Sequence, residues 1–351
     1  MVMRLFYILS LALLMPALSV AAPQLLLILD KTEVQIGHHI DAKLYGIDIN
    51  DKLFDIDLSD LEEKFGITVE ETNGNVEDSR WPNQSVQMSY FKLYPRQTGT
   101  ITIPELIISG EYSQLQTISV TQGIKKTRLG DFNIKHNITL SSAQPWERQQ
   151  IIITAEVETT DTFTSLNSDV LKIPGFEIFP IPPITEKVLR NNIPHSLMRI
   201  GWALLPLTTG QFNIDIPPIR FLKSGRVERT YYFPKQPIVV QALPPYIPPT
   251  MPVGSVNITS KLSSENLLFP ETLSHWDVTL VGNGVSPYWI PPVLRQIKSN
   301  NNLQILPTSS QRLSQVNLNG LQGRVIHHVP FKAITNGGLQ LPNLRIQYFD
   351  P

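Results

Sequence analysis

The sequence predicts an all-β protein made of three tandem antiparallel β-sandwich domains behind an N-terminal signal peptide. Apolar residues recur at every second position, which places them on one face of a strand. Prolines, 29 among 351 residues, leave little room for long helices. Short alternating runs bounded by Gly, Pro and Asn are typical of sandwiches. The clearest runs are Thr100–Ile103, Gln149–Val157, Phe212–Ile216 and Gly338–Leu341.

A repeated segment predicts the number of domains. Leu93–Leu106 is echoed closely in Leu204–Ile219 and more weakly in Val329–Leu344. Each copy combines a strand ending in proline, a turn ending in glycine, and an alternating strand closed by proline. Proline ends ladder pairing, and glycine takes a positive-φ turn position. The repeat residues are Pro95, Gly99 and Pro104, then Pro206, Gly210 and Pro217, then Pro330, Gly337 and Pro342.

The repeats place the predicted β-sandwich domains at residues 22–122, 128–243 and 253–351. Between the second and third lies a proline-rich linker, 244–252. Such a segment favours an extended, semi-rigid spacer, so we expect it to hold these two domains apart. One helical turn is expected at Ser59–Phe65, because its first residues have capping-box spacing.

The N-terminus predicts export. Met1–Arg4 carries one positive charge, Leu5–Val20 is uncharged and mostly apolar, and Ser19 and Ala21 are the small residues of a cleavage site. This order is typical of a signal peptide, here residues 1–21. The alternative is an uncleaved membrane anchor, for which the apolar core is short.

Composition excludes several function classes. The formal net charge is −1 and only 17% of residues are charged, so no basic field is available for nucleic acid. The chain contains no cysteine, which excludes thiolate metal sites and cysteine nucleophiles. An exported chain without disulfides must be held together by its hydrophobic cores.

The seven histidines indicate neither a metal site nor a catalytic site. His38-His39 and His327-His328 are adjacent pairs in strand-like contexts, so the members of each pair should point to opposite faces. No zinc-type spacing is present. A metal-dependent hydrolase that uses the pairs is the alternative, which elemental analysis would test. The isolated histidines are His136, His195 and His275.

Other candidate sites favour structural explanations. The acidic stretch around Asp51–Asp57 has oxygen ligands suited to calcium, but acidic runs are usually solvated faces. No nucleophile elbow, S-x-x-K motif or glycine-rich phosphate loop is present. We therefore predict no enzymatic activity, no cofactor and no metal. Three matches to the glycosylation sequon, at Asn83, Asn137 and Asn257, matter only in a eukaryotic secretory host.

Two aromatic and proline-rich segments have two interpretations. Phe179–Pro183 and Pro287–Pro292 could be exposed contact patches, because aromatic residues are enriched at interfaces. We expect instead that they close the ends of the sandwiches as part of the core.

The order of several short motifs carries a family resemblance. Those motifs are Leu58–Phe65, Leu93–Pro104, Pro252–Gly254, Gly284, Pro291-Pro292, Leu341-Pro342 and Tyr348–Pro351. In this order they resemble the bacterial BatD family of oxygen-tolerance (aerotolerance) proteins, over essentially the whole chain after the signal peptide. No single motif is specific alone.

The resemblance implies Ig-like sandwich domains that face the periplasm of a Gram-negative bacterium, at the inner membrane. It implies von Willebrand factor A-type Bat proteins as partners and, indirectly, a MoxR-type ATPase, in a system of stress tolerance or envelope maintenance. Family members usually have a C-terminal membrane helix, and this sequence reaches Pro351 before one. We therefore expect membrane association through partners or through a helix missing from this sequence.

The predicted function is that of a non-enzymatic, periplasm-facing interaction or scaffold protein of a Bat system. The alternative is a secreted or surface adhesin or a carbohydrate-binding protein, because tandem sandwiches serve that role widely.

Overall fold

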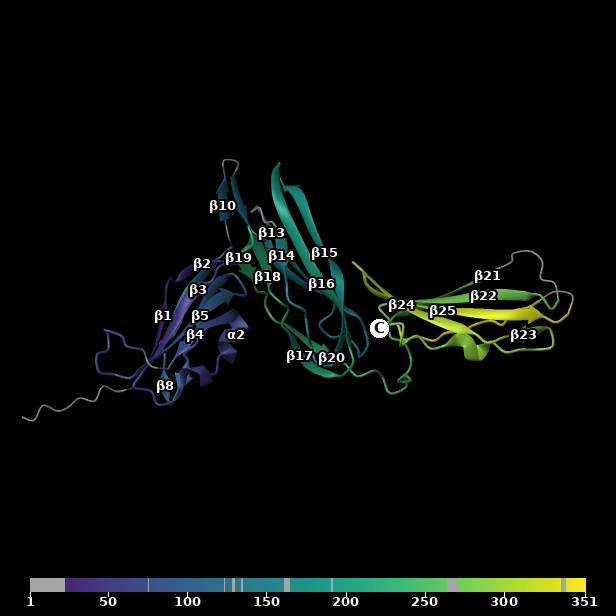
Figure 1. The fold of residues 1–351 in the computed structure, drawn as a ribbon, viewed down its shortest axis with the longest axis horizontal. Helices are drawn as coiled ribbons and strands as arrows, with labels where there is room; N and C mark the ends of the chain where they lie inside the picture. Colours follow the sequence, from purple (N-terminus) through teal and green to yellow (C-terminus); the bar gives the residue numbers. More distant parts are fainter. Residues whose placement is uncertain are drawn as a thin grey trace, which may run out of the picture. The chain divides into compact units, whose positions relative to one another are not determined.

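The computed structural model is all-β, as the sequence predicts (Figure 1). It describes residues 23–74, 76–122, 124–127, 130–133, 135–160, 165–190, 192–263, 270–335 and 339–351. The predicted signal peptide and Gly337 lie outside these residues. The chain divides into two compact units, Met1–Thr121 (unit 1) and Gln122–Pro351 (unit 2). The count of three sandwich domains therefore stays a prediction.

Unit 1 is built from two main sheets and a small hairpin. The larger sheet has the order β1-β3-β5-β4 and is antiparallel throughout. The second has the order β2-β9-β6, in which β2 and β9 run parallel. The strands of unit 1 are β1 (Gln24–Leu29), β2 (Glu33–Gln35), β3 (Ile40–Ile47), β4 (Phe65–Asn73), β5 (Val86–Pro95), β6 (Gly99–Ile103), β7 (Ile107–Ile108), β8 (Glu111–Tyr112) and β9 (Gln116–Thr121).

The expected helical turn is present, but its cap is not the predicted one. Helix α2 covers Ser59–Lys64 and follows a 3-10 turn, η2, at Leu53–Asp55. No side chain caps the helix from its N-cap residue, Leu58. Instead the Ser59 N–H donates to Asp57 Oδ1 at 2.9 Å. The capping-box prediction is wrong because the carboxylate two residues upstream already accepts from this orphan N–H.

The first part of unit 2 contains a four-stranded antiparallel sheet of order β12-β13-β16-β15. A three-stranded sheet (β14-β18-β19), the two-stranded sheet β17-β20 and the hairpin β10-β11 complete this part. Its strands are β10 (Ile124–Thr127), β11 (Gly130–Asn133), β12 (Lys135–Leu140), β13 (Ile151–Thr159), β14 (Ser165–Asn167), β15 (Phe176–Arg190), β16 (Ile193–Pro206), β17 (Gly210–Ile214), β18 (Ile219–Lys223), β19 (Arg226–Tyr231) and β20 (Gln236–Val240).

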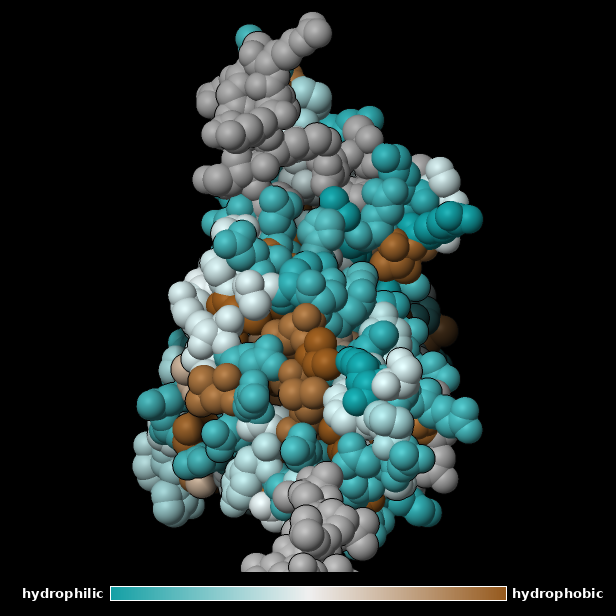
Figure 2. Space-filling view, turned by 90° about the vertical axis from the view of Figure 1, so that its left-hand side faces the viewer, coloured by the Kyte–Doolittle hydropathy of each residue, from teal (hydrophilic) through white to brown (hydrophobic). Residues whose placement is uncertain are grey.

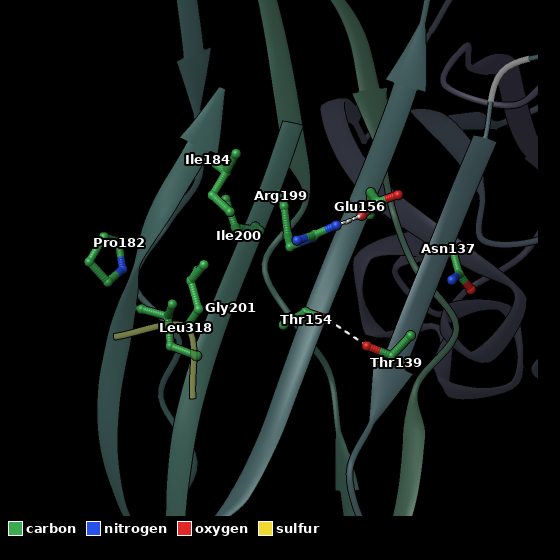
Figure 3. A pocket seen from close by; sticks show the side chains of 11 residues that line it. Asn137, Thr139, Thr154, Glu156, Pro182, Ile184, Arg199, Ile200, Gly201 and Leu318 are labelled. Carbon is green, nitrogen blue, oxygen red and sulfur yellow. Dashed lines mark hydrogen bonds and ion pairs between the residues drawn. The ribbon is translucent and has the colours of Figure 1, made fainter. Parts of the chain in front are cut away.

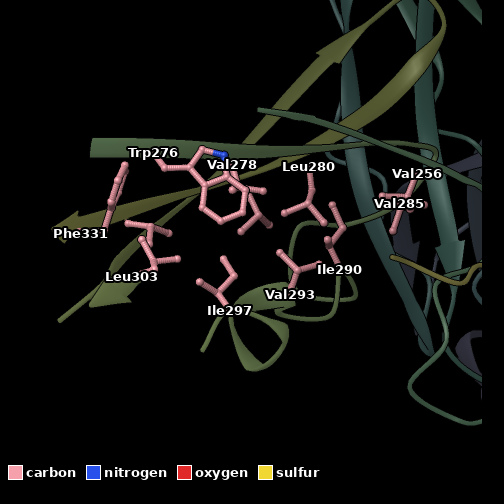
Figure 4. Close-up of a cluster of buried hydrophobic side chains, with 12 residues drawn as sticks. Val256, Trp276, Val278, Leu280, Val285, Ile290, Val293, Ile297, Leu303 and Phe331 are labelled. Carbon is pink, nitrogen blue, oxygen red and sulfur yellow. The ribbon is translucent and has the colours of Figure 1, made fainter. Parts of the chain in front are cut away.

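The last part of unit 2 is one five-stranded sheet, in which β25 pairs with β22, β23 and β24. Its inner face and the 3-10 turn η3 (Val293–Gln296) enclose a core of buried side chains that includes Trp276, Leu280 and Phe331 (Figure 4). The strands are β21 (Ser255–Leu262), β22 (Leu273–Asn283), β23 (Leu303–Ile305), β24 (Ser309–Asn317) and β25 (Gly320–Ala333).

The first two copies of the repeat have matching geometry. Strand β5 ends at Pro95 and β16 ends at Pro206. The glycines that open the next strands, Gly99 and Gly210, both have positive φ, 115° and 138°. Each glycine begins an antiparallel pairing with the last strand of its part, β9 or β20. Pro104 and Pro217 follow the ends of β6 and β17.

The third copy departs from this pattern. Strand β25 continues through Pro330 to Ala333, and Pro330 stays in the ladder because its carbonyl accepts from the Leu306 N–H at 2.9 Å. The expected strand at Gly338–Leu341 is not formed over its described residues, and Pro342 lies in irregular structure. Proline need not end a strand at a position where the backbone nitrogen would not donate a hydrogen bond to a neighbouring strand.

The expected extended spacer is also wrong. The linker contains two turns, closed by bonds from Ile247 N to Pro244 O and from Met251 N to Pro248 O, each 2.9 Å. A guanidinium fixes it: Arg148 Nη1 donates to Pro249 O at 2.6 Å and to Met251 O at 3.0 Å. Folded turns shorten the linker, so the two parts of unit 2 come into direct contact.

We call this contact region the junction. Ala203 and Leu205 of β16 and Leu321 of β25 form a buried cluster, against which Phe179 and Val316 pack. Gln150 Oε1 accepts from the Leu321 N–H at 2.6 Å. The junction is therefore a packed, hydrogen-bonded interface between the two parts of unit 2.

Candidate functional site

A hollow lies on the outer face of the sheet β12-β13-β16-β15 (Figure 3). Its volume is about 200 Å³. All four strands of the sheet contribute to it, and one residue comes from the turn between β24 and β25. The lining residues are Asn137, Thr139, Thr154, Glu156, Ile181, Pro182, Ile184, Arg199, Ile200, Gly201 and Leu318.

Gly201 forms the floor of the hollow. It pairs with Thr154 on one side and Ile181 on the other. A Cβ atom here would lie 2.9 Å from Thr154 Cγ2 and 3.1 Å from the Ile153 carbonyl oxygen. A glycine inside a strand often marks a close approach. Its missing side chain leaves the space that the neighbouring side chains surround.

The polar wall is internally paired. Arg199 Nε donates to Glu156 Oε2 at 2.8 Å, and Arg199 Nη2 contacts the same oxygen. The hydroxyls of Thr139 and Thr154 are hydrogen-bonded to each other across β12 and β13 (Figure 3). The wall therefore offers amide and hydroxyl groups but no uncompensated charge.

The apolar wall comes from β15 and from the neighbouring hairpin. Strand β15 has a register shift between Ile181 and Ile184, and this bulge turns Pro182 toward the hollow's rim. Leu318, at the tip of the β24–β25 hairpin, is 57% exposed. The hollow is thus completed by a residue more than a hundred positions away in sequence.

Larger concavities elsewhere are less well defined. One is lined by residues between Val76 and Val86, and another by residues 296–302 with 340–343. The first lies within one stretch of chain, whereas the second combines two separate segments. Figure 2 shows apolar side chains gathered among hydrophilic ones on one side of the molecule. In unit 1 the exposed large apolar residues include Ile107, Tyr112 and Leu115.

The two histidine pairs lie in different surroundings. His38 and His39 lie in the link between β2 and β3, so their strand-like context is wrong. His327 and His328 lie in β25 and point to opposite faces. His327 Nδ1 bonds to Ser310 Oγ and His328 Nδ1 to Asp277 Oδ1, each at 2.7 Å. Among the described residues, no group of three His, Asp or Glu side chains could hold a metal ion.

The acidic stretch does not converge on one point. Asp51 Oδ2 accepts from the Ser109 hydroxyl, whereas Asp57 accepts from the Ser59 N–H. Asp55 is exposed within η2. Asp51, Asp55 and Asp57 are all exposed, in agreement with the expectation of a solvated face.

The two aromatic and proline-rich segments are divided between core and surface. In Pro287–Pro292, Ile290 is buried, Tyr288 is 77% exposed, and the Arg148 guanidinium lies 4.8 Å from the Trp289 ring centroid. In the other segment Ile181 is buried and Phe179 packs on the junction cluster. The core interpretation therefore holds for part of each segment only: Ile290 belongs to the core of the last sheet, whereas Ile181 and Phe179 are covered on the outer face of β15.

An ion-pair cluster around a buried carboxylate lies on the same outer face. Glu158 is 1% exposed, and its carboxylate lies 2.9 Å from Arg190 Nε, 3.3 Å from Lys135 Nζ and 3.1 Å from His195 Nδ1. The hydrogen bond from Arg190 lowers the pKa of Glu158, and burial opposes this effect. Such a carboxylate would be costly without its partners, so we assign the cluster a structural role.

His136 is the histidine with the clearest pH consequence. Burial lowers its pKa to about 4, although its hydrogen bond to the Tyr232 carbonyl opposes the shift. Its ring stacks on Phe233 with centroids 4.3 Å apart. Because the unfolded chain binds a proton near the ordinary pKa of 6.5, stability should fall as pH falls from there toward 4.

Because of this histidine, we expect the unfolding free energy to be about 2 kcal/mol lower at pH 5 than at pH 7. Urea titrations at several pH values would measure it. His136→Gln keeps a donor for Tyr232 and should make the pH dependence shallower, whereas His275→Gln, at an exposed position, is the matched control. Burial also lowers the pKa of His327, so some dependence should remain. An unchanged slope in His136→Gln would contradict this assignment.

None of the predicted repeat residues lines the hollow. They shape turns and strand ends, whereas the hollow depends on Gly201 and on residues of four strands. The signal for Gly201 was available, because an isolated glycine interrupts the strand-like run before Leu204. Its neighbours could not be inferred, since they depend on strand register.

Comparisons with known proteins add no family assignment. No family model matches the chain, and no curated protein matches it. Among solved structures it is similar to FdeC, an Escherichia coli adhesin, with a TM-score of 0.18 and 8% identity over 92% of this chain and 96% of that one. It is also similar to Yersinia pseudotuberculosis InvD, with a TM-score of 0.17 and 8% identity over 93% and 86%. Both TM-scores are too low to support any inference about this chain.

The described part of the chain contains no helix of the length and apolarity that a membrane crossing requires.

Proposed function

We propose that this chain is an exported, non-enzymatic interaction protein that presents a rigid binding surface to a protein partner. The observation that carries the proposal is the junction in unit 2, beside which the hollow opens. Arg148 is 5% exposed and binds two linker carbonyls, while the cluster around Leu321 seals the adjoining strands. Preorganised surfaces bind more tightly because less conformational freedom is lost on association.

A more specific proposal concerns the identity of the partner, and it rests on the sequence resemblance to BatD. We propose a von Willebrand factor A-type Bat protein as direct partner, with a MoxR-type ATPase acting indirectly. The site of action would be the periplasm or the periplasmic face of the inner membrane. Cell fractionation with a tagged chain would test that location.

Affinity capture tests the interaction. The tagged full chain, incubated with detergent-solubilised inner membranes of its own organism, should recover a protein with a von Willebrand factor A domain, identified by mass spectrometry. Recovery should fall when the junction is loosened by Arg148→Ala but not with Arg295→Ala, which changes an exposed arginine. Failure to recover such a protein would contradict the Bat proposal.

A glycan array provides the contrasting measurement. Specific, saturable binding to a glycan, without capture of a protein partner, would replace the proposal with the adhesin or carbohydrate-binding alternative. The neighbouring reading frames in the genome offer an independent check on the Bat assignment.

A further inference from the structure

We infer that the hollow beside the junction is an anchor pocket that receives one large, uncharged, apolar side chain from a protein partner. The inference rests on the proposed interaction function, and it names the chemistry that the surface recognises.

The size of the hollow indicates a single side chain. Its volume of about 200 Å³ is below the range of about 300–1,000 Å³ that is usual for small-molecule sites. Protein interfaces, in contrast, concentrate binding energy in a few bulky side chains that fill small pockets on the partner. A hollow of this volume on an otherwise regular sheet face suits one such anchor.

The chemistry of the walls indicates that the anchor is uncharged. Glu156 and Arg199 are bonded to each other, as are the hydroxyls of Thr139 and Thr154. A charged group entering the hollow would find no unpaired counter-charge and would lose its hydration. An apolar side chain would instead contact Ile181, Ile184 and Leu318 without disturbing these bonds.

Continuity with the junction supports a protein as the occupant. Along β16, the outer-face residues Leu205 and Ala203 are completely covered by the cluster that Leu321 completes. The next outer-face position is Gly201, where the row of side chains is interrupted and the hollow begins. Leu318 belongs to the same hairpin as Leu321 but is left 57% exposed. A partner's side chain at Gly201 would extend the row of apolar contacts and cover Leu318.

Methyl NMR of the full chain tests the pocket directly. With isoleucine Cδ1 labels, the signals of Ile181 and Ile184 report on the hollow. The probes are acetylated, amidated pentapeptides of sequence Gly-Gly-X-Gly-Gly with X as Leu, Phe, Lys or Glu, together with methyl α-mannoside. The Leu and Phe peptides should shift both signals saturably, whereas the Lys and Glu peptides and the mannoside should not.

The decisive variant is Leu318→Asp, at an exposed hairpin tip where the fold should tolerate it. It should weaken binding of the Leu and Phe peptides at least tenfold. Leu313→Asp is the matched control, because Leu313 is an exposed leucine of β24 that does not line the hollow. Unchanged near-UV circular dichroism would show that both variants are folded. The inference is overturned if no peptide shifts these signals, if the charged peptides or the mannoside shift them instead, or if both variants lose binding equally.

Affinity capture with the same variants separates this inference from the proposed function. If the von Willebrand-type partner is not recovered but the apolar peptides bind, the Bat proposal fails and the anchor pocket stands. If the partner is recovered equally by Leu318→Asp and the parent chain, the interaction function stands and the anchor pocket is overturned.

Discussion

Gly323→Ala should lower the unfolding free energy of unit 2 by about 3 kcal/mol, near the upper end of what overpacking costs. A Cβ atom at this position would lie 2.3 Å from the Val285 carbonyl oxygen and 2.7 Å from the Pro287 nitrogen. Both atoms belong to the backbone, so no side-chain rotation can relieve the contact. The loop would have to move away from the sheet and open the core beneath it.

The pairing of β22 with β25 explains why a side chain at position 323 should be so destabilising. Gly323 lies directly opposite Gly282, and the two glycines provide the space over which the loop from Val285 to Pro287 passes. That loop carries Val285 into the core drawn in Figure 4, and the turn that follows it carries Ile290. Displacing it would therefore uncover apolar surface as well as strain the backbone.

Urea unfolding would measure the effect as a lower midpoint with an unchanged slope. Arg324→Ala, at the exposed neighbouring position, should change the midpoint little. Equal midpoints for Gly323→Ala and the parent chain would show that the loop does not pack on this sheet as described.

Arg148→Ala should also cost about 3 kcal/mol, because it removes two partly buried hydrogen bonds and a cation–π contact. The guanidinium binds Pro249 O and Met251 O and lies 4.8 Å from the Trp289 ring centroid. Burial lowers the pKa of Arg148, and the nearby Glu147 opposes that shift. Without the guanidinium, both carbonyls lose their partner and the linker turns lose their attachment to the preceding strands.

Two readouts separate the stability of the junction from that of the whole chain. Urea unfolding should show the loss of stability, and limited proteolysis should cut the linker at 244–252 faster in Arg148→Ala than in the parent. Arg148→Lys should recover only part of the stability, because an ammonium lacks the planar fork of donors. A linker equally resistant in Arg148→Ala would contradict the role assigned to this arginine.

The sequence was sufficient for the fold class because its signals are local. The alternation of apolar residues along β13 and β17 depends only on neighbouring positions. The same is true of the proline and glycine in Pro95–Gly99 and Pro206–Gly210, which determine the backbone of the few residues beside them. A period of two commits a segment to one buried and one exposed face wherever its partners lie. The same reasoning was wrong for the third copy, where strand β25 continues through Pro330 because its ladder bonds allow it.

The candidate site depended on the tertiary structure. Gly201 was visible as a glycine within a strand, but its neighbours Thr154 and Ile181 are set by the registers of β13 and β15 against β16. Leu318 comes from a different sheet and reaches the hollow only because the junction is packed. The linker shows the same limit, since its prolines favour an extended spacer locally while Arg148 binds it in folded turns.

The sequence by itself therefore determined that this is an all-β protein, since side-chain alternation and turn chemistry act along the chain. Tertiary structure alone decided where the parts of unit 2 meet and where a partner's side chain could enter, since those depend on contacts between residues far apart in sequence.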